Sequence, residues 1–205
     1  MNYHPKDSFY RRAKREGYRS RAAYKLLELN RRFQLIRPGD GVVDLGTAPG
    51  GWLQVAARLV GGRGKVVGAD IQPVEPLAEE NVFIIEGDVT SEECQKRIEG
   101  LLPSGADCVL SDLSPRLTGI RHADVSRSVE LGRAALRVAS RLLKPGGNFL
   151  VKTFVAEELK DFTGELQEHF RTVQATRPEA TRKGSSEIYL CAKGFRKKAA
   201  AATPR

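Results

Sequence analysis

Lysine and carboxylate side chains stand where several apolar segments of the chain begin or end. Lys152 lies within the apolar run FLVKTF, where an ammonium group is costly unless it is paired or used. Asp112 ends a second apolar run, and Glu187 begins a third. Lys25, on a basic segment nearer the N-terminus, can complete a group with them. These residues alone leave two interpretations open: a structural ion pair between Asp112 and Lys152, or a site of proton transfer.

Two amines and two carboxylates suit the activation of a sugar hydroxyl. A ribose 2′-hydroxyl holds its proton tightly, so a base within about 3 Å must remove that proton as the oxygen reacts. A lysine with its ordinary pKa of about 10.4 is mostly protonated, but a nearby cation and partial burial both lower that value. We predict that Lys152 is the base and Lys25 the neighbouring cation. Asp112 and Glu187 are predicted to fix the geometry.

The segment from Asp44 to Trp52, DLGTAPGGW, follows another apolar run and turns sharply. Gly46 and Gly50 allow the backbone of this loop to approach a ligand closely. The loop has Ala48 where a dinucleotide fingerprint needs its middle glycine, and it lacks the Gly-Lys-Ser/Thr of a phosphate-binding loop. It therefore predicts a ligand without a pyrophosphate, and a plain strand-to-helix turn is the alternative.

Two further aspartates end the next two apolar runs. Asp70 can accept hydrogen bonds from both hydroxyls of a ribose, and Asp88 can accept from the amino group of an adenine. Either could instead cap a following helix, which is the favoured interpretation for Asp88 taken alone. In order with Asp44 and the glycine loop, they predict an adenosine-bearing ligand without phosphates, which is S-adenosylmethionine. Its positive sulfur already activates the methyl group, so we expect no metal ion.

These residues need a scaffold that collects the ends of strands at one edge. Apolar runs alternate with amphipathic segments, which predicts an α/β fold with a mostly parallel sheet and helices on both faces. Ligands bind such sheets beyond the carboxyl ends of the strands. Ser20 is a candidate N-cap for the second helix. The predicted strands are 41–45, 65–70, 82–86, 107–112, 147–153, 171–176 and 187–192, and the predicted helices are 8–16, 21–33, 51–60, 91–101, 124–143 and 156–169.

Positive charge is concentrated at the two ends of the chain. Residues 1–40 hold 11 Lys and Arg against 4 Asp and Glu, residues 193–205 hold 5 against none, and residues 41–192 hold 18 against 21. A phosphate backbone attracts this pattern, so RNA is the expected partner, and a solvated arm without a partner is the alternative. Tyr18 is a candidate to stack on a base, and Tyr24 either stacks or belongs to the core. The candidate phosphate contacts are Arg11, Arg12, Lys14, Arg15, Arg19 and Arg21.

The expected organisation is a basic helical extension for RNA docking over residues 1–36, a catalytic domain over 37–193 and a flexible basic tail over 194–205. No apolar run is long enough to span a membrane, and the first 20 residues do not look like a secretory signal. Cys94, Cys108 and Cys191 lie far apart, which excludes a CxxC zinc site and argues against a disulfide framework. We expect a cytoplasmic monomer that does not bind membranes.

Five segments resemble the FtsJ/RrmJ-type ribosomal RNA ribose 2′-O-methyltransferases, the RlmE family, over roughly residues 6–193. They are GYRSRAAYKL from Gly17, VDLGTAPGGW from Val43, Ser111-Asp112, VKTF from Val151 and SEIY from Ser186. The resemblance implies a Rossmann-like class I SAM-dependent methyltransferase fold with a seven-stranded sheet whose last strand is antiparallel. It also implies a catalytic tetrad of Lys25, Asp112, Lys152 and Glu187, and cofactor contacts at Gly50, Trp52, Asp70, Asp88 and Asp112.

The same resemblance implies a substrate. The family's usual target is a uridine ribose in the A-loop of large-subunit ribosomal RNA of the 23S type, and related members act on the tRNA anticodon loop. Arg116 departs from the family pattern, in which Asn is expected soon after the Asp-x-x-Pro segment. The loop that contains Arg116 is expected to touch the substrate.

Other activities fit these residues less well. Methylation of a base carbon needs a nucleophilic cysteine near the fourth strand end, and Cys108 is expected to pack inside that strand. Methylation of a base amino group would use a Pro-Pro-aromatic motif after Asp112, where this chain has Leu-Ser-Pro. A small-molecule methyltransferase would not need the basic N-terminus. A non-catalytic RNA-binding protein on a methyltransferase fold would have no need of Lys152 in an apolar strand.

Overall fold

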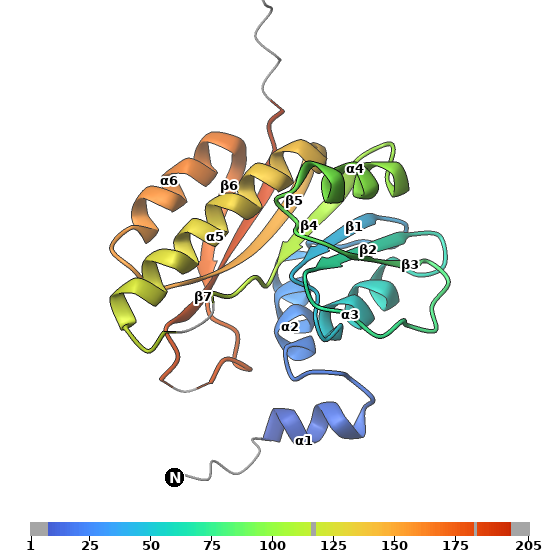
Figure 1. Ribbon diagram of the computed structural model, residues 1–205, viewed down its shortest axis with the longest axis horizontal. Coiled ribbons are helices and arrows are strands. Elements are labelled where there is room, and N and C mark those ends of the chain that lie inside the picture. The colour runs from blue at the N-terminus through green and yellow to red at the C-terminus, as the bar shows by residue number, and fades with distance from the viewer. Residues whose placement is uncertain (1–7, 116–117, 183, 198–205) are drawn as a thin grey trace, which may run out of the picture.

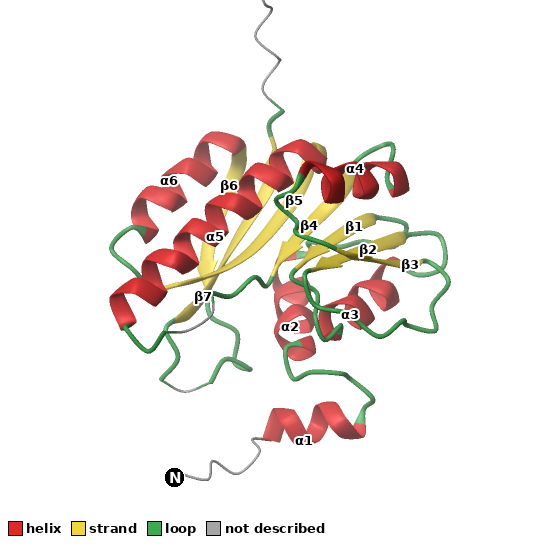
Figure 2. Cartoon of the chain, viewed as in Figure 1, coloured by secondary structure: helices red, strands yellow, loops and turns green. Residues whose placement is uncertain are grey.

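Seven strands form one sheet in the order β3-β2-β1-β4-β5-β7-β6 (Figure 1, Figure 2). The computed structural model describes residues 8–115, 118–182 and 184–197, so Arg116 and the tail from residue 198 onward lie outside the described residues. The strands are β1 (Gly41–Leu45), β2 (Lys65–Asp70), β3 (Val82–Glu86), β4 (Ala106–Ser111), β5 (Leu143–Phe154), β6 (Phe170–Thr176) and β7 (Glu187–Phe195). The helices are α1 (Ser8–Arg15), α2 (Ala23–Phe33), α3 (Gly51–Val60), α4 (Glu92–Leu101), α5 (Arg121–Leu142) and α6 (Leu159–His169).

Strand direction in the sheet confirms the predicted fold class. β1 pairs in parallel with β2 and β4, β2 pairs in parallel with β3, and β4 with β5. β7 lies between β5 and β6 and is antiparallel to both. Every residue of β1, and nearly every residue of β2 and β4, is buried, which is why these strands are continuous apolar runs in the sequence.

Alternate residues of the strands face two separate apolar cores, so helices cover both faces of the sheet. Val42 and Leu110 pack on one face with α2 and α3, whereas Val43 and Val109 pack on the other with α4, α5 and α6. Helix α1 packs on the molecule through Ala13, against Tyr24 of α2 and Ala180. Tyr24 is only 6% exposed, which confirms the core alternative for this residue.

Several element boundaries differ from the prediction, and contacts of named side chains or strands account for three of them. Ser20 does not cap α2, which begins after Ala22 without a side-chain cap. The Ser20 side chain instead packs beside Gly51, where a Cβ would collide with its Oγ. Helix α5 begins three residues earlier than predicted, and Asp124 in its first turn accepts the backbone N–H groups of Thr118 and Gly119. β5 begins at Leu143, where it pairs with the start of β4.

Candidate active site

Lys25, Asp112, Lys152 and Glu187 lie together and are joined through one tyrosine hydroxyl. Lys152 Nζ lies 3.0 Å from Asp112 Oδ1 and donates to the Asp112 backbone oxygen at 2.8 Å. Lys25 Nζ lies 2.5 Å from Glu187 Oε1. The Tyr189 hydroxyl lies 2.6 Å from Glu187 Oε1 and 3.3 Å from Asp112 Oδ1. The two ion pairs therefore form one connected cluster, which we call the tetrad, with Tyr189 between its halves.

Four separate elements supply the tetrad. The antiparallel pairing of β5 with β7 sets Lys152 opposite Tyr189, and Glu187 lies two residues earlier on the same face of β7. β4 ends one residue before Asp112, and Lys25 lies in the first turn of α2. The carboxyl ends of β4 and β5 and the start of the antiparallel β7 meet at one edge of the sheet, which brings together residues that are far apart in the chain.

Tyr189 is completely buried and was missed by the sequence prediction as a residue of the site. Burial and the charges of Asp112 and Glu187 raise the pKa of its phenol well above the ordinary value, so the hydroxyl keeps its proton and donates it. The ring of Trp52 packs near it, with 6.0 Å between ring centroids. The sequence signal that could have found Tyr189 is its spacing from Glu187, because residues i and i+2 of a strand share a face.

The charge state of Glu187 follows from its neighbours. Burial alone would raise its pKa, but the charge and hydrogen bond of Lys25 and the hydrogen bond of Tyr189 outweigh burial and hold the pKa below its ordinary value. Glu187 is therefore an ionised carboxylate that anchors the Lys25 ammonium. Lys152, only 8% exposed, is held in the same way by the Asp112 oxygens. The arrangement has the parts of an acid–base centre, with two fixed amines and two carboxylates.

Gly46 and Gly50 lie in the loop after β1, which we call the glycine cradle, in backbone conformations with φ of 79° and 105° that other residues rarely adopt. Leu45, at the start of this loop, accepts the backbone N–H of Asp112 at 3.1 Å, which sets the loop beside the tetrad. A Cβ at Gly46 would lie 2.8 Å from Leu113 Cδ2 and 3.1 Å from the Leu113 backbone nitrogen. A Cβ at Gly50 would lie 2.9 Å from an Arg19 guanidinium nitrogen. The loop after β1 therefore touches the loop after β4, and only glycine permits that approach.

The two other predicted cofactor aspartates follow β2 and β3. Asp70 accepts the backbone N–H groups of Ala48 and Gln72, each at 2.9 Å, and so ties the glycine loop to the end of β2. Asp88 is exposed and accepts the N–H two residues further on at 2.8 Å. The helix-capping alternative is wrong for both: Ser91 caps α4, and no helix forms within the described segment 71–81 that follows Asp70.

Asp44 is completely buried at the end of β1. Its Oδ2 accepts from Thr47 Oγ1 at 2.6 Å, whereas its Oδ1 is buried with no hydrogen-bond partner in the described part of the chain. Burial, opposed by the Thr47 bond and reinforced by the charges of Asp112 and Asp70, raises the pKa of Asp44 to about 7. An orphaned carboxylate oxygen next to the glycine cradle fits a ligand that brings a positive group.

Trp52 turns away from the cradle. Its Nε1 donates to the Ala22 backbone oxygen at 2.9 Å, and the residue is only 3% exposed. Its backbone N–H belongs to the first turn of α3, where the N–H groups lack intrahelical partners and suit a carboxylate. Any ligand contact of Trp52 is thus expected through its backbone rather than its ring.

The predicted phosphate contacts fall into two groups. Arg11, Lys14 and Arg15 are exposed on α1. The others bond to the protein itself, in the contacts Arg12 with Glu16, Arg19 with the carbonyls of Pro49 and Pro76, Arg21 with the carbonyl of Ala180, and Tyr18 with Arg58. The basic side chains of α1 are thus exposed to solvent, whereas the Arg19 guanidinium bonds to the Pro49 carbonyl of the glycine loop and stabilises it.

The profile of FtsJ-like methyltransferases matches residues 18–195 of this sequence. The chain belongs to the FtsJ-like methyltransferase family. A protein of Methanothrix thermoacetophila named ribosomal RNA large subunit methyltransferase E is 52% identical over 188 residues, covering 92% of this chain and 72% of the relative. A protein of the same name from Archaeoglobus fulgidus is 52% identical over 191 residues, covering 93% of this chain and 97% of the relative.

A solved structure is similar to this FtsJ-like methyltransferase over most of its length. It is described as a ribosomal RNA methyltransferase from Plasmodium falciparum, with a TM-score of 0.79, 27% identity, and coverage of 87% of this chain and 98% of that one. The predicted family and the prediction of a methyltransferase are confirmed by these comparisons.

Three further features concern only the residues that the structure describes. None of their helices is long and apolar enough to cross a membrane. No three of their His, Cys, Asp or Glu side chains gather into a group that could hold a metal ion. Cys94, Cys108 and Cys191 are free and buried, and Cys108 packs inside β4 as predicted.

Proposed function

We propose that this FtsJ-like methyltransferase methylates a ribose 2′-hydroxyl of large-subunit ribosomal RNA. The observation that carries the proposal is the connected tetrad beside the glycine cradle, because it places a buried amine where the strand ends gather ligands. The relatives named ribosomal RNA large subunit methyltransferase E support this substrate. The family resemblance favours a uridine in the A-loop, and the tRNA anticodon loop is the alternative.

S-adenosylmethionine supplies, when bound, a methyl group on a positively charged sulfur. The orphaned oxygen of Asp44 fits the ammonium of such a ligand, and the backbone N–H groups in the first turn of α3, which lack intrahelical partners, suit its carboxylate. Asp70 and Asp88 would serve the ribose and the adenine. The proposed cofactor contacts are Asp44, Gly46, Gly50, Trp52, Asp70, Asp88 and Asp112.

Lys152 is the proposed general base. In its amine form, its Nζ accepts the proton of the ribose 2′-hydroxyl as the oxygen becomes a nucleophile. The two Asp112 oxygens fix the position of that nitrogen, at 2.8 and 3.0 Å. Lys25, which pairs with Glu187, orients the ribose hydroxyl from the other side. The Tyr189 hydroxyl lies between the carboxylates of Asp112 and Glu187 and fixes their relative positions. Reactants that a protein holds in the productive orientation react much faster than free ones.

The experiment is transfer of a labelled methyl group from S-adenosylmethionine to large-subunit particles, free ribosomal RNA and tRNA that all lack the modification. We expect a single ribose 2′-O-methyl group in the A-loop, mapped at nucleotide resolution. Labelling of tRNA instead would select the alternative substrate. A methyl group on a base, or binding of RNA with no transfer to any of the three substrates, would contradict the proposal.

A further inference from the structure

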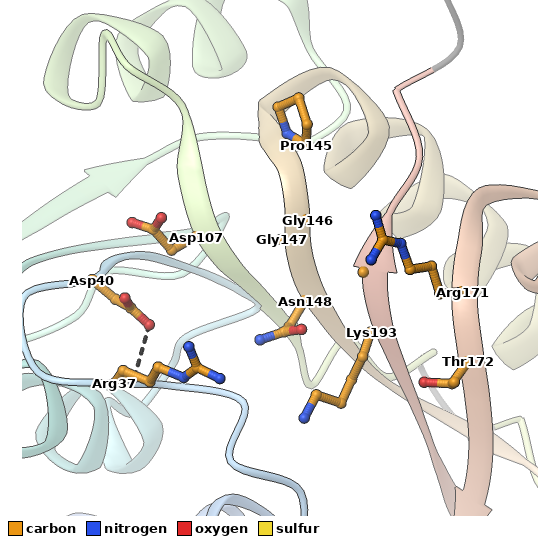
Figure 3. A pocket seen from close by; sticks show the side chains of 11 residues that line it. Arg37, Asp40, Asp107, Pro145, Gly146, Gly147, Asn148, Arg171, Thr172 and Lys193 are labelled. Atoms are coloured by element: carbon orange, nitrogen blue, oxygen red, sulfur yellow. Dashed lines mark hydrogen bonds between the residues drawn. The ribbon is translucent and has the colours of Figure 1, made fainter.

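A second charged feature lies away from the tetrad. A groove of about 420 Å³ opens at the amino ends of the parallel strands, and it shares no residue with the tetrad (Figure 3). Asn148 in this groove pairs with Lys193, whereas Lys152 pairs with Tyr189. The two features are therefore four residues apart along β5, or roughly 13 Å at about 3.3 Å per residue. The groove is a separate place on the same two strands.

Three basic side chains line the groove. Arg37 and Arg171 are exposed, and Lys193 is half-buried and donates to the Phe33 backbone oxygen at 2.7 Å, which holds it at the end of α2. Gly194 has φ of 75°, and a Cβ there would lie 3.0 Å from Arg171 Cδ. Glycine at this position thus leaves room for the Arg171 side chain to lie close against β7 (Figure 3).

Two carboxylates also line the groove, and both are engaged. Asp107 accepts from Lys144 Nζ at 2.8 and 2.9 Å. Asp40 accepts the backbone N–H of Arg37 at 2.7 Å, and burial raises the pKa of Asp40 above its ordinary value. Three cations of the lining and Lys144 face two carboxylates, so the groove has a net positive charge.

We propose that this groove binds the phosphate backbone of RNA and holds the substrate at a second point away from the tetrad. None of the described residues that line it has an aromatic ring, so it offers no surface for stacking a base, and its donors suit phosphate and sugar oxygens. β7 ends at Phe195 beside the groove, and residues 193–205 carry 5 Lys and Arg and no Asp or Glu. This inference rests on RNA as the substrate of the proposed function.

The test compares the whole protein with the double variant Arg37→Glu/Arg171→Glu. Binding is measured at several salt concentrations to a long fragment of large-subunit ribosomal RNA and to a short hairpin that can reach only the tetrad end. We expect the variant to lose about ten-fold or more in affinity for the long fragment. The slope of log affinity against log salt concentration, which we call the salt slope, should become smaller by about 2. Affinity for the hairpin and binding of S-adenosylmethionine should be nearly unchanged. Arg137→Glu/Lys160→Glu, at exposed positions on α5 and α6, is the matched control.

Several outcomes would overturn the proposal that this groove binds RNA. The double variant could bind the long fragment with the wild-type affinity and salt slope, or it could weaken hairpin and fragment equally. Inorganic phosphate or adenosine monophosphate could bind in a manner that needs Arg37 and Arg171 while RNA affinity is unchanged, which would assign the groove to a small anion. If the double variant melts early, Arg37→Gln and Arg171→Gln replace it. If the wild-type protein transferred no methyl group to RNA, the proposed function would be contradicted. The effect of the double variant on RNA affinity could still be measured and interpreted.

Discussion

A lysine side chain within a buried strand is costly, and Lys152 shows how the surrounding oxygens offset that cost. Asp112 provides both a carboxylate and a backbone carbonyl, and Tyr189 ties that carboxylate to Glu187. An ion pair with a purely structural role would need only two of these residues. The second amine, Lys25, joined to the same network, is the feature that a structural pair does not explain.

Lys152→Met should slow methyl transfer strongly but leave the fold and the proposed cofactor contacts intact, because methionine fills a similar volume without a basic nitrogen. Loss of a general base lowers a rate by about 10² to 10⁴-fold. Binding of S-adenosylmethionine, measured by calorimetry, should stay close to that of the wild type. Lys160→Met, at an exposed position on α6, is the control. A Lys152→Met protein that no longer folds cooperatively would restore the interpretation as a structural ion pair.

Asp44 should make the stability of the protein depend on pH. Its pKa is raised to about 7 in the folded protein, whereas an unfolded chain releases this proton near pH 4. Between these values the folded state binds more protons than the unfolded state, so the free energy of unfolding falls as pH rises and levels off above about 7. Asp44→Asn removes the free-energy cost of burying this carboxyl in its charged form.

We therefore expect Asp44→Asn to be more stable than the wild type by roughly 2–4 kcal/mol at pH 8, and nearly equal to it at pH 4. Urea unfolding across this pH range measures the difference. Glu157→Gln, at an exposed position, should leave the profile unchanged. If the free energy of unfolding changed with pH in the same way in Asp44→Asn and in the wild type, the pKa of Asp44 would not be raised in the folded protein.

At the scale of elements, the loop after β1 depends on glycine where it meets the loop after β4. Gly46→Ala should destabilise the protein by about 2 kcal/mol or more, because its φ is positive and its Cβ would meet the Leu113 backbone. Cofactor binding should weaken with it. Gly100→Ala, in α4 with open space around it, should instead stabilise by about 0.5–1 kcal/mol. Equal melting temperatures for the two variants would contradict this account of the cradle.

The strands and helices were predictable because their signals are local. β1, β2 and β4 are apolar on both faces, and the amphipathic segments between them pack on one side only. Ser20 was assigned the wrong role and Tyr189 none, because a contact with Gly51 decides the one, and contacts with Glu187 on the same strand and with Asp112 after β4 decide the other. The tetrad residues could be named from the sequence, but the hydroxyl that joins its halves could not.

At the scale of the whole molecule, the basic residues of α1 provide the most direct test of RNA binding. The variant Arg11→Gln/Lys14→Gln/Arg15→Gln removes exposed charge and keeps the packing of Ala13. We expect weaker binding to ribosomal RNA and a salt slope reduced by roughly 2–3, since each lost phosphate contact contributes about 0.7–0.9. The control is Arg137→Gln/Lys160→Gln, with two exposed charges removed elsewhere. Unchanged affinity in the α1 variant would favour a solvated arm without a partner.

The position of β7 has a consequence for how the protein comes into being. β7 is the last strand of the described chain, yet it inserts between β5 and β6 and supplies Glu187 and Tyr189. During synthesis the tetrad therefore cannot assemble until residues 187–195 have left the ribosome. The earlier strands can pair with one another before then, but Lys25 and Asp112 lack their partners Glu187 and Tyr189 until β7 docks.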